Sequence, residues 1–268
     1  TQAEITAALV TTDTLVVAAT ATVTSSDAMS VTEANAVDAK TSGVITATLD
    51  TGDTASYSTL TGTGNAYTVT VNDANTTAIT ATALSTLGGK TTGTVTVSNA
   101  IAISGTQSEI TAALVTPGTL VLAATATVTS SDAMSVTEAN AVDAKTSGVI
   151  TATLDTGDAA SFSGLTGTDN AYTVTVSGSI SVTNVNTLDT KTTGAITATV
   201  ISATAATLTT VTINDANSNN DIDVAVTALH STLAADLSGL STTSGTVTAA
   251  FDSSGTFTGD LGSAVVTV

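Results

Sequence analysis

A run of oxygen-bearing side chains between residues 215 and 223 has the spacing of a cation-binding loop. Asp and Asn recur there at every second position, so their oxygens can converge on one side of a tight loop, which suits Ca²⁺. The acidic residue that closes an EF-hand loop is missing, because Val226 stands in its place. A solvated polar turn is the alternative. The candidate calcium ligands are Asp215, Asn217, Asn219, Asp221 and Asp223.

Residues for catalysis or cofactor binding do not form a recognisable set. His230 is the only histidine, and no serine or acid is singled out as its partner. Gly89-Lys90-Thr91 is similar to the end of a phosphate-binding loop, but Leu84 occupies the position where that motif needs its first glycine. We therefore expect no catalytic residue and no bound organic cofactor, and we expect that the protein is not an enzyme.

The composition indicates a secreted, acidic surface protein. The chain has 268 residues and a net charge of −18, with 22 acidic residues against four lysines. Such a charge repels nucleic acid and anionic membranes, so neither is expected as a partner. No apolar stretch is long enough for membrane insertion, and there is no cysteine. The start at Thr1 without a signal peptide fits a processed chain or a piece of a longer one.

The dominant feature is an internal repeat. Residues 1–71 and 106–176 align without a gap at an offset of 105 positions, and they differ at only eight of them. We interpret the chain as one continuous array over residues 1–268, with repeats at 1–105 and 106–210 and a remainder at 211–268.

A shorter motif divides each repeat into units of about 50 residues. Lys-Thr-(Ser or Thr)-Gly occurs four times and contains all four lysines of the chain. Asp38, Asp143 and Asp189 each stand two residues before one of these lysines and could pair with it. The four copies are Lys40–Gly43, Lys90–Gly93, Lys145–Gly148 and Lys191–Gly194.

Alternating Thr and Val around the motif predict strands with one buried face. Ala66–Val71 and Ala171–Val176 are the clearest of these. Short helices are expected after Thr1 and Thr106, where Glu follows three residues later as in a capping box, and also over residues 31–40 and 227–240. We expect a mainly β fold, a parallel β-solenoid with short helical turns; tandem Ig-like β-sandwiches are the alternative.

The repeats resemble the large repetitive surface proteins of cyanobacteria and other Gram-negative bacteria, which are adhesin-like or haemolysin-type and leave the cell by type I secretion. The resemblance rests on N-A-V-D-A-K-T-S-G-V-I-T-A-T-L, N-T-L-D-T-K-T-T-G-A-I-T-A-T-V, G-L-T-G-T-D-N-A-Y-T-V-T-V and S-G-T-Q-S-E-I-T-A-A-L-V. It implies an extracellular or cell-surface location and a structural or adhesive role, with no catalytic residues. The G-G-x-G-x-D calcium repeat of toxins is absent.

These observations together predict a structural component of an extracellular filament, sheath or surface layer that assembles with itself by repeat stacking. The alternatives are an adhesin stalk and an ice- or carbohydrate-binding module. The expected partners are further copies of the chain, and then other surface components or polysaccharide. The A-V-V-T-V sequence at residues 264–268 has no polar cap, which favours head-to-tail association.

Overall fold

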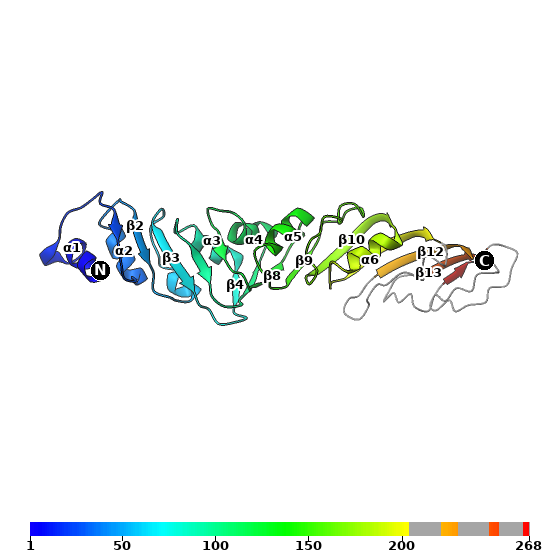
Figure 1. The fold of residues 1–268 in the computed structure, drawn as a ribbon, viewed down its shortest axis with the longest axis horizontal. Helices are drawn as coiled ribbons and strands as arrows, with labels where there is room; N and C mark the ends of the chain where they lie inside the picture. Colours follow the sequence, from blue (N-terminus) through cyan, green and yellow to red (C-terminus); the bar gives the residue numbers. More distant parts are fainter. Residues whose placement is uncertain (204–220, 230–246, 252–264, 268) are drawn as a thin grey trace. The chain divides into compact units, whose positions relative to one another are not determined.

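The computed structural model describes the backbone of residues 1–203, 221–229, 247–251 and 265–267, and the side chains through residue 200 (Figure 1). Two compact units can be distinguished. The first comprises Thr1–Ser131 with Ala141–Gly148, and the second comprises Asp132–Asn140 with Val149–Val268.

Six α-helices of eight residues each occur in the described part of the chain. The expected capping boxes are present at Thr1 with Glu4 and at Thr106 with Glu109, and a third joins Ser30 to Glu33. These caps satisfy backbone N–H groups of the first turn, which helps such short segments to be helical. The helices are α1 (Gln2–Leu9), α2 (Val31–Asp38), α3 (Ala81–Gly88), α4 (Gln107–Leu114), α5 (Val136–Asp143) and α6 (Val182–Asp189).

The strands of the first unit pair in chain order and always in parallel. One row is β1-β2-β3-β5-β7 and another is β4-β6-β8. Buried Val, Ile, Tyr and Ala side chains alternate with exposed Thr along them, as the Thr–Val alternation predicts. The strands are β1 (Val23–Thr24), β2 (Ile45–Thr48), β3 (Ala66–Val71), β4 (Ala78–Thr80), β5 (Val95–Val97), β6 (Ala102–Gly105), β7 (Val121–Leu122) and β8 (Thr127–Ser130).

In the second unit the strands likewise pair in parallel, each with the next along the chain, in the order β9-β10-β11-β12-β13-β14. Paired residues on successive strands are about twenty residues apart in the sequence; Val174 of β10, for example, faces Ile196 of β11. The strands are β9 (Ile150–Thr153), β10 (Ala171–Ile180), β11 (Ile196–Ala203), β12 (Asp221–Leu229), β13 (Val247–Phe251) and β14 (Val265–Thr267).

The fold is mixed α/β with two all-parallel sheets, so the prediction of a mainly β fold, the β-solenoid, is wrong. Short helices lie between strands throughout the described chain, because sequences that read as polar turns contain N-caps followed by apolar helical faces. The alternative of Ig-like sandwiches is also wrong, since those have antiparallel sheets and every described pairing is parallel. The helix expected at 227–240 is contradicted at residues 227–229, which belong to β12.

Candidate functional site

The predicted calcium ligands fall mostly outside the described residues. Asp215, Asn217 and Asn219 lie there, as does His230. Asp221 and Asp223 are in β12, where their backbone positions face Thr197 and Thr199 of β11. Within the described residues, no three Asp, Glu, His or Cys side chains are grouped so that they could hold a metal ion. Calcium binding by the loop at 215–223 stays a prediction.

The Lys-Thr-(Ser or Thr)-Gly motif forms a joint between its own loop and the segment about twenty residues earlier in the same repeat. In the second copy of the motif, Thr91 is buried, and its hydroxyl oxygen Oγ1 accepts a hydrogen bond from the backbone N–H of Tyr67 at 2.7 Å. The same hydroxyl lies 2.8 Å from the carbonyl oxygen of Tyr67 and 3.0 Å from that of Asn65. It also accepts from the N–H of Gly93 at 2.9 Å. A single side chain thus ties its own loop to a strand more than twenty residues earlier.

The other three motifs repeat this arrangement. Each threonine is buried and donates to a backbone carbonyl about twenty residues earlier: Thr41 to Ala21 at 2.6 Å, Thr146 to Ala126 at 2.5 Å and Thr192 to Tyr172 at 2.8 Å. Each also accepts from the N–H of its own motif glycine, at 2.9 to 3.0 Å. The acceptors belong to the main chain, so the joint does not depend on the neighbour's side chains.

The glycine of the motif is required because the two segments approach closely. A Cβ atom at Gly93 would lie 2.2 Å from the carbonyl oxygen of Tyr67, and one at Gly194 would lie 2.3 Å from that of Tyr172. A Cβ atom at Gly43 would lie 2.1 Å from the carbonyl oxygen of Ala21, and one at Gly148 would lie 2.2 Å from that of Ala126. Such distances are far inside van der Waals contact, so any other residue would force the joint apart.

Two buried asparagines add a second connection that the sequence did not single out. The Oδ1 atom of Asn65 accepts from the N–H of Ile45 at 2.9 Å, and Asn170 does the same for Ile150 at 2.8 Å. Asn65 also donates to the Oδ1 of Asp38 at 2.7 Å. The sequence suggests Lys40 as the partner of Asp38, whereas in the structure the Asp38 carboxylate accepts a hydrogen bond from Asn65. The shared N-A-Y context of the two asparagines was the signal that could have identified them.

Helix-borne asparagines make a third kind of connection. Asn35 of α2 donates to the carbonyl of Thr59 at 2.8 Å and accepts from the N–H of Thr61 at 2.9 Å. Its equivalent Asn140 in α5 bonds in the same way to Gly164 and Thr166, at 2.7 and 3.0 Å. Each amide thus satisfies a donor and an acceptor of the loop beside its helix, which fixes the helix to that loop.

Shifted pKa values are explained by local hydrogen bonds and by burial. The Ser56 hydroxyl and backbone lower the pKa of Asp53, and Ser161 does the same for Asp158. The N–H of Thr106 is the main cause of the lowered pKa of Glu109. These acids cap turns and helices, so their shifts express a structural role.

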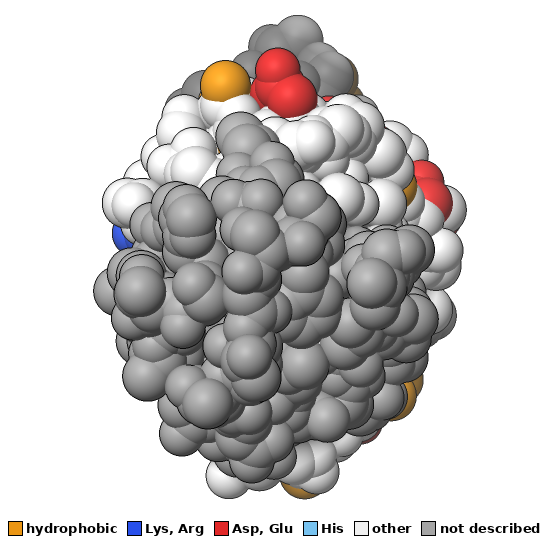
Figure 2. All heavy atoms as spheres, turned by 90° about the vertical axis from the view of Figure 1, so that its right-hand side faces the viewer, with side chains coloured by type: hydrophobic (Ala, Val, Ile, Leu, Met, Phe, Trp, Pro, Cys, Tyr) orange, Lys and Arg blue, Asp and Glu red, His pale blue; other side chains and the backbone are white. Residues whose placement is uncertain are grey.

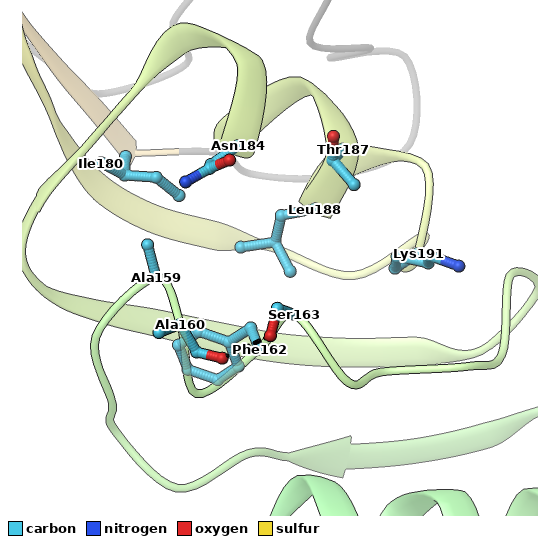
Figure 3. A pocket seen from close by; sticks show the side chains of 9 residues that line it. All are labelled: Ala159, Ala160, Phe162, Ser163, Ile180, Asn184, Thr187, Leu188 and Lys191. Carbon is cyan, nitrogen blue, oxygen red and sulfur yellow. Dashed lines mark hydrogen bonds between the residues drawn. The ribbon is translucent and has the colours of Figure 1, made fainter.

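A cavity of about 420 Å³ lies in the second unit between α6 and the loop that carries Phe162 (Figure 3). Phe162, Ile180 and Leu188 give it an apolar wall, and Lys191 stands at one side. Asn184, Ser163 and Thr187 supply its polar atoms, and Ala159 and Ala160 complete the lining. The lining offers one cation and no acid, so it has no acid–base pair.

The first repeat shows what is different around this cavity. There, Thr54 donates from its backbone N–H and its hydroxyl to Asp73, at 2.7 and 2.6 Å. The second repeat has Ala159 in place of Thr54, and its turn after Val176 is four residues shorter, so this carboxylate has no counterpart. The second repeat therefore has neither the threonine nor the aspartate of this pair, and Ala159, which replaces the threonine, lines the cavity.

No protein-family model, no curated protein and no solved structure matches the chain. Within the described residues, no helix is both long enough and apolar enough to cross a membrane.

Proposed function

We propose that the chain is a structural repeat protein that assembles with itself into an extracellular filament, sheath or surface layer. The observation that carries this proposal is the joint built from the Lys-Thr-(Ser or Thr)-Gly motif. The same buried threonine and the same closely packed glycine recur in all four motifs, and they connect each motif loop to the segment about twenty residues before it. A chain in which one polar motif repeatedly fastens a loop to the preceding segment is suited to stacking many such segments.

The surface supports the same role. Along the strands the outward positions are mostly threonine, and the described surface visible in Figure 2 is mostly backbone or side chains that are neither hydrophobic nor charged. The acidic residues give a net charge of −18, and arrays that carry this charge repel one another and so stay soluble. The extracellular location rests on the resemblance of the repeats to secreted surface proteins.

Light scattering across a concentration series, with negative-stain electron microscopy of the same samples, tests the proposal. We expect particle mass to rise with concentration and elongated assemblies to be visible. A monomer at every concentration, with no assemblies on the grid, would show that the proposed function is wrong. The same series with added Ca²⁺ and with a chelator tests whether calcium at the 215–223 loop takes part.

A further inference from the structure

The two repeats differ in the length of one turn. In the first repeat the turn after β3 spans residues 72–78, and its counterpart within β10 spans only residues 177–179. The longer turn is fastened to the loop beside it, because Thr54 donates to the Asp73 carboxylate through its backbone N–H and its hydroxyl. The shorter turn has no equivalent of this aspartate, so it is not fastened in this way to Ala159, which replaces the threonine.

The loop beside the turn also differs between the repeats. In the first repeat it contains the 3₁₀ helix η2 (Thr54–Tyr57), which packs on α3. The equivalent residues 159–162 form a turn, and the cavity of about 420 Å³ lies between this turn and α6 (Figure 3). The cavity therefore lies where the second repeat has both the shorter turn and the replaced threonine.

The cavity has an apolar floor and polar groups at its edge. Phe162, Ile180 and Leu188 line it, and each is at most 4% exposed. Asn184 and Thr187 are exposed residues of α6 that also line it. Small-molecule sites typically have volumes of about 300–1,000 Å³ and combine an apolar lining with a few polar groups. The cavity is thus suited to the apolar body of a small molecule.

Lys191 gives the lining its only charge, and the described residues give this lysine no ion pair. Asp158 precedes the lining residue Ala159 in the sequence, but its carboxylate accepts from the N–H and hydroxyl of Ser161, at 2.9 and 2.7 Å. In Figure 3 the lysine stands beyond Leu188 at one end of the cavity, with its ammonium group turned outward. A negative group at that end would meet the ammonium and stay in contact with water.

We propose that this cavity binds a small amphipathic carboxylate, with its apolar body between Phe162 and Leu188 and its carboxylate at the Lys191 end. A neutral apolar molecule has the floor alone, whereas a carboxylate adds a charge-assisted contact without being removed from water. The net charge of −18 repels anions from the chain as a whole, so a carboxylate should bind where a lysine and an apolar floor coincide. This binding is independent of self-assembly and does not rest on the proposed function.

Octanoate and octanol are matched probes, because they have alkyl chains of the same length and differ in charge. In isothermal titration calorimetry with the full 268-residue chain, octanoate should bind about fivefold more tightly than octanol, which is the effect of one partly exposed ion pair. Added salt should reduce this difference, since ions screen the pair. Changes in the NMR signals of the Ile180 and Leu188 methyl groups would locate the bound octanoate in the cavity.

Lys191→Gln tests the position of the carboxylate. The substitution removes the charge and keeps a polar side chain, so we expect octanoate to bind about fivefold more weakly and octanol to bind as before. Lys90→Gln is the matched control, because Lys90 holds the equivalent position in the first repeat, where η2 and the longer turn are present. This control should bind both probes as the parent does.

Two further variants fill the cavity. Ala159→Phe places a ring in the space toward which Ala159 points in Figure 3, and it should abolish binding of both probes. The second variant carries the sequence of residues 72–78 in place of 177–179 together with Ala159→Thr, which restores the threonine–aspartate pair of the first repeat. It should also bind neither probe. A melting temperature close to that of the parent shows that each variant is folded.

Charge-dependent octanoate binding that is lost in the filled chains supports the proposal. Three results would overturn it: no octanoate binding to the parent at millimolar concentration, equal affinity for octanol, or parent-like octanoate binding by Lys191→Gln or by a folded filled chain. If neither filled chain folds, Lys191→Gln decides alone. None of these results bears on self-assembly, so the proposed function stands or fails separately.

Discussion

The hydroxyl of Thr91 bonds to both the N–H and the carbonyl of Tyr67, at 2.7 and 2.8 Å. Replacing Thr91 by Val keeps the shape of the side chain and leaves these buried backbone groups without their partner. We expect the free energy of unfolding of the first unit to fall by about 2–3 kcal/mol. Urea unfolding measures this loss, and faster hydrogen exchange of the Tyr67 amide locates it.

Thr96→Val is the control for this change, because Thr96 lies on the exposed side of β5. Its effect should stay within about 0.5 kcal/mol. Equal losses from both substitutions would mean that the buried hydroxyl has no special role in the joint.

Substitution of the motif glycine Gly93 should destabilise the protein more than substitution of Thr91 does. Gly93→Ala places a methyl group 2.2 Å from the carbonyl oxygen of Tyr67, so we expect a loss of about 3 kcal/mol or failure to fold. Gly118→Ala is the comparison, since no atom lies within 4 Å of an added Cβ there. Thermal melting of the two variants distinguishes them, and a Gly93→Ala chain that melts with the parent would contradict the close approach.

The two repeats differ by one hydroxyl group at equivalent positions, Tyr57 and Phe162. The Tyr57 hydroxyl lies 2.7 Å from the carbonyl oxygen of Asp50 and 2.8 Å from that of Thr70, whereas the equivalent Phe162 has no hydroxyl. Tyr57→Phe should cost about 1 kcal/mol, and Phe162→Tyr should gain a similar amount if the second repeat accepts the same bond. Denaturant unfolding of both variants measures the two effects. Opposite signs are required; two losses would show that the loops around these residues differ.

The buried phenol of Tyr67 is predicted to be dispensable at neutral pH. Its hydroxyl has no hydrogen-bond partner among the described residues, so Tyr67→Phe should leave stability unchanged or raise it by about 1 kcal/mol. Burial, with a smaller effect of Asp38, raises its pKa to about 12. A loss above about 1 kcal/mol on substitution at pH 7 would indicate a partner for this hydroxyl.

The pH dependence of stability follows from that shift. An ordinary tyrosine ionises near pH 10, so the folded state holds the Tyr67 proton more tightly than the unfolded state does. The contribution of the neutral phenol is complete below about pH 10 and is lost as the pH rises toward 12. Melting temperature measured at steps from pH 9 to pH 12 should fall more steeply for the parent than for Tyr67→Phe; parallel curves would contradict the raised pKa.

Much of the local structure could be predicted from the sequence. Alternation located β3 and the first part of β10, and the spacing of Thr1 and Glu4 located the capping box of α1. The fold class could not be predicted in the same way. Helix α3 is built from Ala, Thr, Leu and Ser and carries no acidic residue in its first turn, so its sequence does not stand out from a turn. It is helical because Thr80 caps it and because Leu84 and Leu87 are buried in the folded chain.

The sequence shows the motif that forms the joint but does not show which segment the motif contacts. The Lys-Thr-(Ser or Thr)-Gly repeat marked the position of Thr91 and Gly93, but nothing local indicates that their partner is the backbone of Tyr67. That contact joins residues 24 positions apart and exists only when the parallel pairing is formed. The repeat position of Asn65 and Asn170 was visible too, although their role depends on the same pairing.

Because the threonine of each joint bonds to a main-chain oxygen, the residue type at the acceptor position can vary. Alanine provides the acceptor at residues 21 and 126, and tyrosine provides it at residues 67 and 172. Each 105-residue repeat contains two such joints within itself, so unequal crossing-over between copies of the gene can add or remove a whole repeat with its joints intact. The near-identity of residues 1–71 and 106–176 is what such growth leaves behind, and the length of the array becomes a property that selection can adjust one unit at a time.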